Sequence, residues 1–486
     1  MNEKSQITDL KKEILIKIVE AFYSDDFAEN VRRIPYKMRP SGCAVPYRCC
    51  VHKERAILRD RTLAGLGLSI ENSVGMISLS EYARQALERE TPEEHILTVL
   101  HDACQGCAKA ATKVTDLCQG CVARPCVGAC KLGAIDICKG RASIIPDKCK
   151  NCGRCHDVCP YNAIVKIRVP CEDICPVDAI SKMDDGNAQI DFEKCISCGR
   201  CVGGCPFGAI HEKSQIVDIL KKIKQGKEVI ALVAPSIVGQ FNFGIEKLAS
   251  ALKQIGFSQV YEVAYGADIT ARLEAKEFSG RMAQGDPFMT TSCCNAYMEL
   301  VRRHMPDMVK YVSETKTPAH HSAKLAKEEN PGCITVFVSP CTTKRKEGLI
   351  DPEIDYVLNF VELNDIFSAC KINLSECKET EFKHKSSAQG RGFPATGGVA
   401  KAVGQVVNCG KCEHAKLKPH LVSGFSKLAI SNLKKYAKTG VCSEGNLIEI
   451  MACTGGCIGG NACLNPVKTA LGKIEGYSKE SFDLEP

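Results

Sequence analysis

The chain has 486 residues, too many for a single hydrophobic core, so we expect two to four domains. Its 44% hydrophobic and 25% charged residues are ordinary for a soluble globular protein, and no stretch approaches the roughly 18 consecutive apolar residues of a membrane-spanning helix. The first twenty residues mix both charges without an apolar signal block. We therefore expect a cytoplasmic protein whose 32 cysteines bind metal rather than form disulfides.

Three regions follow one another along the chain. Residues 1–100 have apolar residues at helical spacing and predict a small, mainly helical N-terminal region. Residues 101–212 hold most of the clustered cysteines among short apolar runs, as is typical of α+β ferredoxin-like modules. From 213 to 486, β-rich runs such as VIALVAPS and ITVFVSP alternate with helical patterns, which predicts an α/β domain with a mainly parallel sheet. The polar stretch 371–390 predicts an exposed loop.

Two cysteine runs match C-x2-C-x2-C-x3-C-P without deviation, a spacing typical of 4Fe-4S clusters. In two-cluster ferredoxins the first three cysteines of a run bind one cluster and the fourth reaches the other. A stretched run, C-x2-C-x4-C-x3-C, precedes them and pairs with the first of the two, so that Cys159 completes cluster one and Cys130 completes cluster two. The three runs are Cys118, Cys121, Cys126 and Cys130, then Cys149, Cys152, Cys155 and Cys159, then Cys195, Cys198, Cys201 and Cys205.

The segment PCEDICPVDAI supplies a further half-run, Cys171 and Cys175. Cys175 completes a third cluster with the first three cysteines of the last run. Cys171 and Cys205 then lack two partners, and DACQGC supplies Cys104 and Cys107 for a fourth cluster. The alternatives for these four cysteines are zinc binding or no redox role. The sequence therefore predicts three or four accessory 4Fe-4S clusters.

Three separated motifs follow in the second half of the chain: TSCCNAY at 291–297, SPCTTKRKE at 339–347 and MACTGGC at 451–457. In this order, and with APS at 234–236 and FPATGGV at 393–399, they resemble the H-cluster motifs of the iron-only (FeFe) hydrogenases. The cysteine-rich region resembles that of the monomeric multi-cluster members. The resemblance implies an α/β catalytic domain of two Rossmann-like lobes around an H-cluster. It also implies a ferredoxin-linked enzyme that reversibly reduces protons to hydrogen.

The resemblance further implies which residues hold the H-cluster, a 4Fe-4S cubane joined to a two-iron subsite with CO, cyanide and dithiolate ligands. Lys344 and Ser236 match residues that contact cyanide, and a cation beside an anionic ligand is the expected pairing. Met451 matches a residue that packs on the subsite. The cubane ligands would be Cys294, Cys341, Cys453 and Cys457, of which Cys457 would also bridge to the two irons.

Protons must reach the metal along a chain of titratable groups. By resemblance, Cys293 is the last proton donor, preceded by Glu274, Glu277, Ser313 and Arg281. The two glutamates are three residues apart on one predicted helical face, so a proton can pass along it. Without the flanking motifs, such a pair is more often a solvated helix surface.

Several positions depart from the family pattern. Asn295 and Tyr297 stand where the best-studied members have proline and tryptophan. Ser339 replaces a methionine that abuts the subsite, and Ala319 stands where a glutamine is frequent. These changes are expected to retune hydrogen bonding around the cluster, and none deletes a ligand.

Other cysteines and two histidines have no assigned role. Cys463 is an additional thiol after the last motif, and His320 and His321 lie near the expected active-site lobe, where ordinary packing is the alternative. The remaining thiols either form further metal or redox sites or are simply buried; they are Cys370, Cys377, Cys409, Cys412, Cys43, Cys49 and Cys50.

The formal net charge of +7 would suit a nucleic-acid partner, but a cubane with four thiolates has a charge of about −2, and five would bring the chain to about −3. We expect no nucleic acid and no membrane, and an acidic partner guided by the basic residues. The resemblance implies ferredoxin or a similar redox protein, hydrogen and protons, and maturation proteins for the two-iron subsite, in an anaerobic cell. The alternative class is a hydrogenase-like sensory or iron–sulfur assembly protein without two-iron catalysis. Loss of Cys457, Cys293 or Lys344 would favour it, and all three are present.

Overall fold

Four helices form the N-terminal region of the computed structural model, which describes residues 6–42, 50–70, 75–107, 111–409 and 416–485. Apolar residues at three-to-four spacing give α1 a buried face, on which Ile14, Ile18 and Phe22 are at most 4% exposed. This face packs on the other N-terminal helices and on α15 of the C-terminal region. The four helices are α1 (Gln6–Phe22), α2 (Phe27–Met38), α3 (Val51–Gly65) and α4 (Leu79–Glu88).

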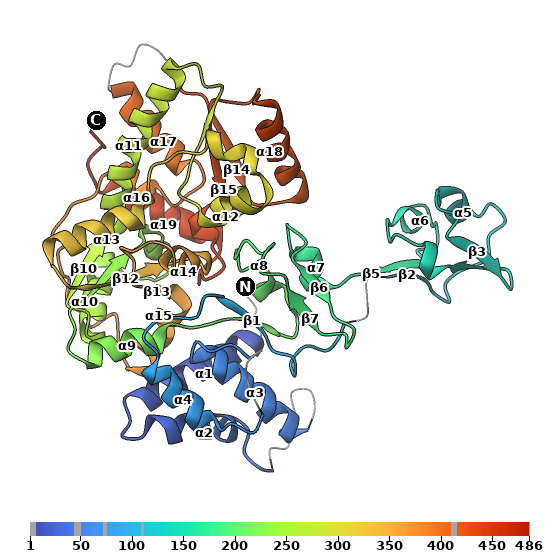
Figure 1. The fold of residues 1–486 in the computed structure, drawn as a ribbon, viewed down its shortest axis with the longest axis horizontal. Coiled ribbons are helices and arrows are strands. Elements are labelled where there is room, and N and C mark those ends of the chain that lie inside the picture. The colour runs from blue at the N-terminus through green and yellow to red at the C-terminus, as the bar shows by residue number, and fades with distance from the viewer. Residues whose placement is uncertain (1–5, 43–49, 71–74, 108–110, 410–415, 486) are drawn as a thin grey trace.

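The cysteine-rich region folds as one small module inserted into another (Figure 1). The body module, residues 97–107 and 169–212, is closed by β1 (Leu97–Val99), which pairs antiparallel with β8 (Ile210–Glu212). The ferredoxin-like pairing thus begins a few residues before position 101. Its other elements are α7 (Pro170–Ile174), β6 (Ile180–Lys182), β7 (Ala188–Ile190) and α8 (Arg200–Gly204).

The inserted module, residues 111–168, projects from the rest of the molecule on a two-stranded neck (Figure 1). The neck is formed by its first and last strands, β2 (Ala111–Val114) and β5 (Ile164–Ile167), which pair antiparallel with Ala111 opposite Ile167. The module has a small core of its own, built from Cys126, Ile135, Cys155 and Ile164. Its other elements are α5 (Pro125–Ala129), β3 (Ile135–Cys138), β4 (Arg141–Ile144), the 3-10 turn η1 (Pro146–Lys148) and α6 (Arg154–Asp157).

The C-terminal region contains two parallel sheets, which confirms the prediction of a mixed α/β fold with parallel strands. The first has the order β10-β9-β12-β13 and the second β11-β15-β14. The central strands are almost continuously apolar and buried, as strands covered on both faces require. The strands are β9 (Val229–Val233), β10 (Gln259–Glu262), β12 (Ile334–Ser339), β13 (Tyr356–Asn359), β11 (Met289–Thr290), β14 (Pro419–Ser423) and β15 (Leu447–Met451).

Helices cover both sheets, and none of the described helices is long and apolar enough to cross a membrane. They are α9 (Ile216–Lys224), α10 (Ile245–Ile255), α11 (Val263–Ala283), α12 (Asn295–His304), α13 (Pro318–Glu329), α14 (Thr343–Gly348), α15 (Phe360–Ala369), α16 (Ala388–Gly392), α17 (Gly398–Cys409), α18 (Lys427–Thr439) and α19 (Val467–Lys479). Four 3-10 turns complete the described elements: η1 above, η2 (Pro235–Gly239), η3 (Pro306–Tyr311) and η4 (Cys457–Gly459).

The polar stretch 371–390 is only partly the exposed loop that its composition predicts. Cys377 is 5% exposed, and Ser386 and Ser387 are fully buried. The Ser387 side chain donates a hydrogen bond to Asp268 and accepts one from the Gly390 N–H at the start of α16. The exposed-loop prediction is wrong at this end because buried partners satisfy the polar groups.

Candidate metal centre

A buried pocket of about 90 Å³ lies where the carboxyl ends of strands from both sheets meet. Parallel strands direct the loops at their carboxyl ends to one side of a sheet, which is where α/β proteins bind ligands. The loops after β9, β11, β12 and β15 contain the APS, TSCC, SPC and MAC motifs respectively. All four motifs contribute residues to the lining of this pocket.

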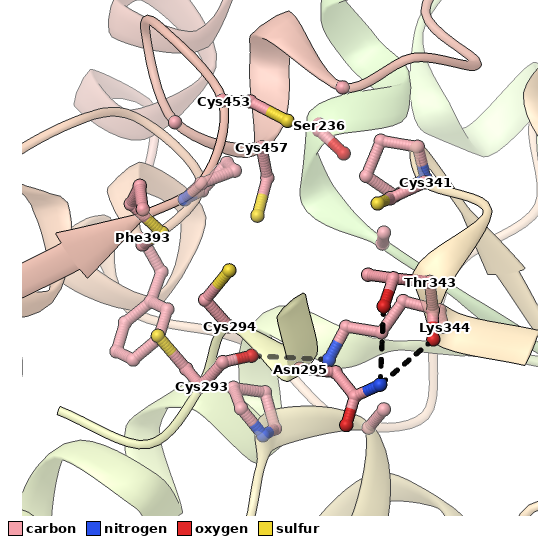
Figure 2. A pocket seen from close by; sticks show the side chains of 18 of the residues that line it. Ser236, Cys293, Cys294, Asn295, Cys341, Thr343, Lys344, Phe393, Cys453 and Cys457 are labelled. Carbon is pink, nitrogen blue, oxygen red and sulfur yellow. Dashed lines mark hydrogen bonds between the residues drawn. The ribbon is translucent and has the colours of Figure 1, made fainter. Parts of the chain in front are cut away.

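Four thiols from three of these loops converge in the pocket. Figure 2 shows their sulfur atoms directed toward one central space; they belong to Cys294, Cys341, Cys453 and Cys457. A cubane needs one thiolate near each of its four irons, and this donor set fits that requirement. Among the described residues, no three His, Cys, Asp or Glu side chains are arranged around the position of a single metal ion. All described cysteines are free of disulfide bonds.

Two polar side chains face the same pocket beside the thiols. Ser236 is fully buried, and its Oγ has no hydrogen-bond partner within the described part of the chain. Lys344 pairs with Glu347 and donates to the Cys293 carbonyl oxygen at 3.2 Å. Burial acts to lower the pKa of Lys344, but the charge of Glu347 outweighs it, so the pKa is raised and the side chain is a cation. An orphaned hydroxyl and a fixed cation suit small anionic or diatomic ligands on a metal unit.

The loops that supply the thiols are tied to one another by hydrogen bonds that the sequence did not predict. The Asn295 Nδ2 donates to the carbonyl oxygen and the hydroxyl of Thr343, at 3.0 and 3.2 Å (Figure 2). Asn295 follows Cys294 and Thr343 lies two residues after Cys341, so this amide links two ligand loops. Ser339 accepts from the Cys341 N–H at 3.1 Å and donates to the Cys341 carbonyl oxygen.

A buried carboxylate holds the FPATGGV loop against the pocket. Glu449, 1% exposed in the middle of β15, accepts from the backbone N–H groups of Gly397 at 2.6 Å and Ala400 at 2.9 Å. Phe393 and Pro394 at the start of that loop line the pocket, as does Met451 at the end of β15. The one available indication in the sequence was a charged residue inside an otherwise apolar strand, NLIEIM.

The residues expected to form a proton relay lie in a row from the pocket toward the surface. Cys293 lines the pocket at 8% exposure, and Glu274 behind it is fully buried on α11. The Ser313 hydroxyl donates to Glu277 at 2.7 Å, and Arg281 pairs with the same carboxylate at 2.7 Å. Arg281 also donates to two backbone carbonyls next to Ser313. The structure therefore brings together all five residues that the resemblance implied.

The two glutamates of this row differ in protonation. Burial raises the pKa of Glu274 to about 8, with the nearby charge of Glu277 adding to the effect. Burial also acts on Glu277, but hydrogen bonds from the Glu314 N–H, Ser313 and Thr315 and the charge of Arg281 outweigh it and lower its pKa. At neutral pH the row thus joins a protonated carboxyl to an ionised one, an arrangement suited to passing a proton between them.

The inserted module groups its eight run cysteines into the two expected sets. In the first set, the charges of Cys121 and Cys159 act on Cys126 and raise its pKa after the larger effect of burial. In the second set, Cys149 and Cys152 act in the same way on Cys155. The remaining members are Cys118 of the first set and Cys130 of the second, and Cys130 packs in the same small core.

The body module groups the other eight. Burial raises the pKa of Cys198 to about 12, and the neighbouring charges of Cys195 and Cys175 contribute; Cys201 has the same three thiols as neighbours. Around Cys171, Lys182 donates to the Cys104 sulfur at 3.7 Å and acts on the Cys171 thiol, as does Cys205. Cys104 and Cys107 pack against the same core as Cys171.

The insertion explains why the first run of the body module was difficult to find. If residues 108–168 are left out, the remaining letters are CQGCVPCEDICP, which is C-x2-C-x2-C-x3-C-P. Cys104, Cys107, Cys171 and Cys175 are therefore one ferredoxin run that is split after its second cysteine. This gives the body module two complete runs, the number that two clusters require.

The body module contacts the pocket directly. Cys198 lines the pocket together with Cys453, and its charge raises the Cys453 pKa after burial and two nearer thiols. Beside it, the Thr342 hydroxyl donates to Glu212 at 2.9 Å and its N–H donates to Asn461 at 3.0 Å. These bonds fix the module against the loop that contains Cys341.

The remaining residues lie away from the pocket lining. His320 pairs with Asp351 at 2.8 Å, and burial lowers the pKa of His321 to about 4. Cys370 and Cys377 pack in the core shared with the N-terminal helices, whereas Cys409 is exposed at the end of α17. Cys463 donates weakly to the Cys457 carbonyl oxygen at 3.5 Å. Cys50 is exposed, and Cys43, Cys49 and Cys412 lie outside the described residues.

Comparisons with known proteins agree with this arrangement. Residues 227–461 match the C-terminal domain of the iron-only hydrogenase large subunit; residues 142–165 match a 4Fe-4S binding domain and 165–216 an LdpA Fe-S cluster-binding domain. Iron hydrogenase 1 of Clostridium pasteurianum is 30% identical over 296 residues, 49% of this chain and 51% of that protein. A probable cytosolic Fe-S cluster assembly factor of Nematostella vectensis is 25% identical over 227 residues, 38% and 52% of the two chains.

A solved structure of a variant of FeFe-hydrogenase HydA1 from Chlamydomonas reinhardtii aligns with 56% of this chain and 90% of its own, at 19% identity and a TM-score of 0.42. The chain spans about half the length of the curated relatives it matches. It contains the C-terminal domain of an iron-only hydrogenase large subunit, preceded by 4Fe-4S binding modules. The chain belongs to the iron-only hydrogenase family.

Deleting residues 108–168 tests the split run. The deletion joins Cys107 to Val169 and restores continuous spacing, so we expect the protein to lose about eight irons, those of two cubanes, and to retain the clusters of the body module. Metal analysis and electron paramagnetic resonance measure this. As a control, Cys104→Ser with Cys107→Ser in the deleted chain should remove about four more irons. An unchanged iron content in that control would contradict the fourth cluster.

The protonation of Glu274 can be measured by infrared spectroscopy. Its pKa near 8 predicts a protonated carboxyl band at neutral pH that disappears as the pH rises through about 8. Glu274→Gln should remove the band, whereas Glu277→Gln should leave a Glu274 band in place. A Glu274 carboxyl that is already ionised at pH 6 would contradict this environment.

Proposed function

We propose that this chain is an FeFe hydrogenase that catalyses the reversible reduction of protons to hydrogen, with electrons relayed through 4Fe-4S clusters. The observation that supports this most directly is the convergence at one pocket of four thiols, an orphaned hydroxyl, a cation and a relay to the surface. The two parallel sheets would be the two Rossmann-like lobes around the H-cluster.

Each group at the pocket has a distinct proposed role. Cys294, Cys341, Cys453 and Cys457 would bind the cubane, and Cys457 would also bind the two-iron subsite. When bound, that subsite supplies the redox chemistry that interconverts protons and electrons with hydrogen. Lys344 and Ser236 would hold its small ligands by hydrogen bonds, and Met451 would pack against it. The pairing of Lys344 with Glu347 fixes the cation in place.

Proton movement is assigned to the row on α11. Glu277 is about 16% exposed and ionised, so it can accept a proton near the surface, where Arg281 and Ser313 orient its carboxylate. Glu274 is protonated at neutral pH and lies between that carboxylate and Cys293. Cys293 would donate the last proton into the pocket. A pKa near the working pH is what a proton-transfer group needs.

Electron supply is assigned to the accessory thiol groups. Cys198 and Cys453 line the same pocket, so the groups that they bind would lie close together, as electron transfer between them requires. The body module would connect the inserted module to this point. Ferredoxin or a similar small protein is the proposed partner, and maturation proteins would supply the two-iron subsite.

A hydrogenase-like sensory or iron–sulfur assembly role is the second candidate. It is favoured by Ala319, whose methyl group occupies the pocket wall where a polar side chain is frequent in the enzymes, and by the similarity to a probable assembly factor. The presence of Cys293, Cys457 and Lys344 at one pocket favours catalysis over this alternative.

Replacement of Cys293 tests the catalytic proposal. In anaerobically matured protein, Cys293→Ala should lower hydrogen formation from reduced methyl viologen about 100-fold or more, because loss of a positioned proton donor has effects of this size. Iron content should be unchanged. The matched control is Cys333→Ala, which removes another buried thiol that does not line the pocket. Hydrogen turnover absent from the mature parent protein would favour the sensory or assembly role.

A further inference from the structure

The inserted module exposes more apolar surface than its size explains. Of the seventeen large hydrophobic side chains that are exposed in the described part of the chain, seven lie within residues 111–168. The module is joined to the body by its neck (Figure 1), and its small core is separate from the others. Clustered exposed apolar residues on a soluble module indicate a surface that binds another protein.

The most exposed of these residues surround the first thiol set. Leu117 is 60% and Val122 is 98% exposed, and they flank Cys118 and Cys121. This loop packs on the turn between β3 and β4, because a Cβ added at Gly120 would lie 2.5 Å from the Gly140 carbonyl oxygen. That turn presents two exposed basic residues, Lys139 and Arg141. We name this surface the tip, defined by Leu117, Val122, Lys139 and Arg141.

The charge distribution selects the kind of partner. Residues 111–168 contain ten Lys and Arg, four Asp and no Glu, a formal charge of +6, while the whole chain has +7. With two cubanes of about −2 each, the inserted module keeps about +2. The rest of the chain, near +1 before three further clusters, falls to about −5. An acidic protein is therefore attracted to the inserted module and repelled by the body.

We propose that the tip is the docking surface for an acidic one-electron carrier protein. The carrier loses one electron and is oxidised, and the group bound by Cys118, Cys121, Cys126 and Cys159 gains it and is reduced, with no bond or proton exchanged. A small apolar centre with a basic rim suits a transient redox complex, which binds weakly and dissociates quickly. The inference rests on the proposed function only for the presence of that cluster.

Charge reversal at the tip tests this in the full chain. The variant is Lys139→Glu with Arg141→Glu, and the matched control is Lys227→Glu with Lys253→Glu, the same charge change on exposed residues of the body. Stopped-flow bleaching measures cluster reduction by a reduced acidic ferredoxin. We expect the second-order rate constant to fall about tenfold for the tip variant at low ionic strength and less than about twofold for the control.

A second variant separates docking from long-range attraction. Val122→Ser keeps the charge, and we expect it to slow cluster reduction by the same ferredoxin about threefold while its salt dependence stays that of the parent. Equal slowing in the tip and control double variants, or no slowing in either tip variant, would overturn the proposal. Iron content identifies a variant that has lost its cluster. The readout is independent of hydrogen turnover, so a chain that forms no hydrogen still tests the docking surface.

Discussion

The position of four sulfur atoms around one buried pocket is the constraint on which the C-terminal region depends. The thiols come from loops after β11, β12 and β15, which are far apart in the chain, and a cubane tolerates little freedom in its ligands. Parallel strands solve this problem by placing their carboxyl ends at a common edge. Glu449 and Asn295 then fix the loops by hydrogen bonds to backbone groups and to Thr343, so that the site is formed before any metal binds.

The cysteine-rich region obeys the same constraint over a longer distance. One ferredoxin-like unit has been split after its second cysteine, and the ends of the insertion are brought together by the pairing of β2 with β5. Because Ala111 and Ile167 are opposite each other, the insertion leaves the geometry of the split run intact. The result is a positively charged module held away from a body whose bound clusters would make it negative.

The sequence predicted the ligand sets, the parallel strands and the row on α11, because each depends on local spacing or on a short motif. It did not predict the insertion, since the two halves of the split run are recognisable as one run only when residues 108–168 are set aside. The Asn295–Thr343 and Glu449 bonds join residues at least 48 positions apart, which no periodicity records. The burial of Ser386 and Ser387 was missed for the same reason, because their composition alone indicates solvent.

The central claim is that Cys457 attaches a two-iron subsite with CO and cyanide ligands to this pocket. Infrared spectroscopy of the anaerobically matured full chain measures this most directly, because these ligands absorb where proteins do not. The parent protein should show the diatomic bands, and Cys457→Ala should lose them while retaining the iron of the two cysteine-rich modules. A fully matured parent without these bands, or a Cys457→Ala variant that keeps them, would contradict the assignment.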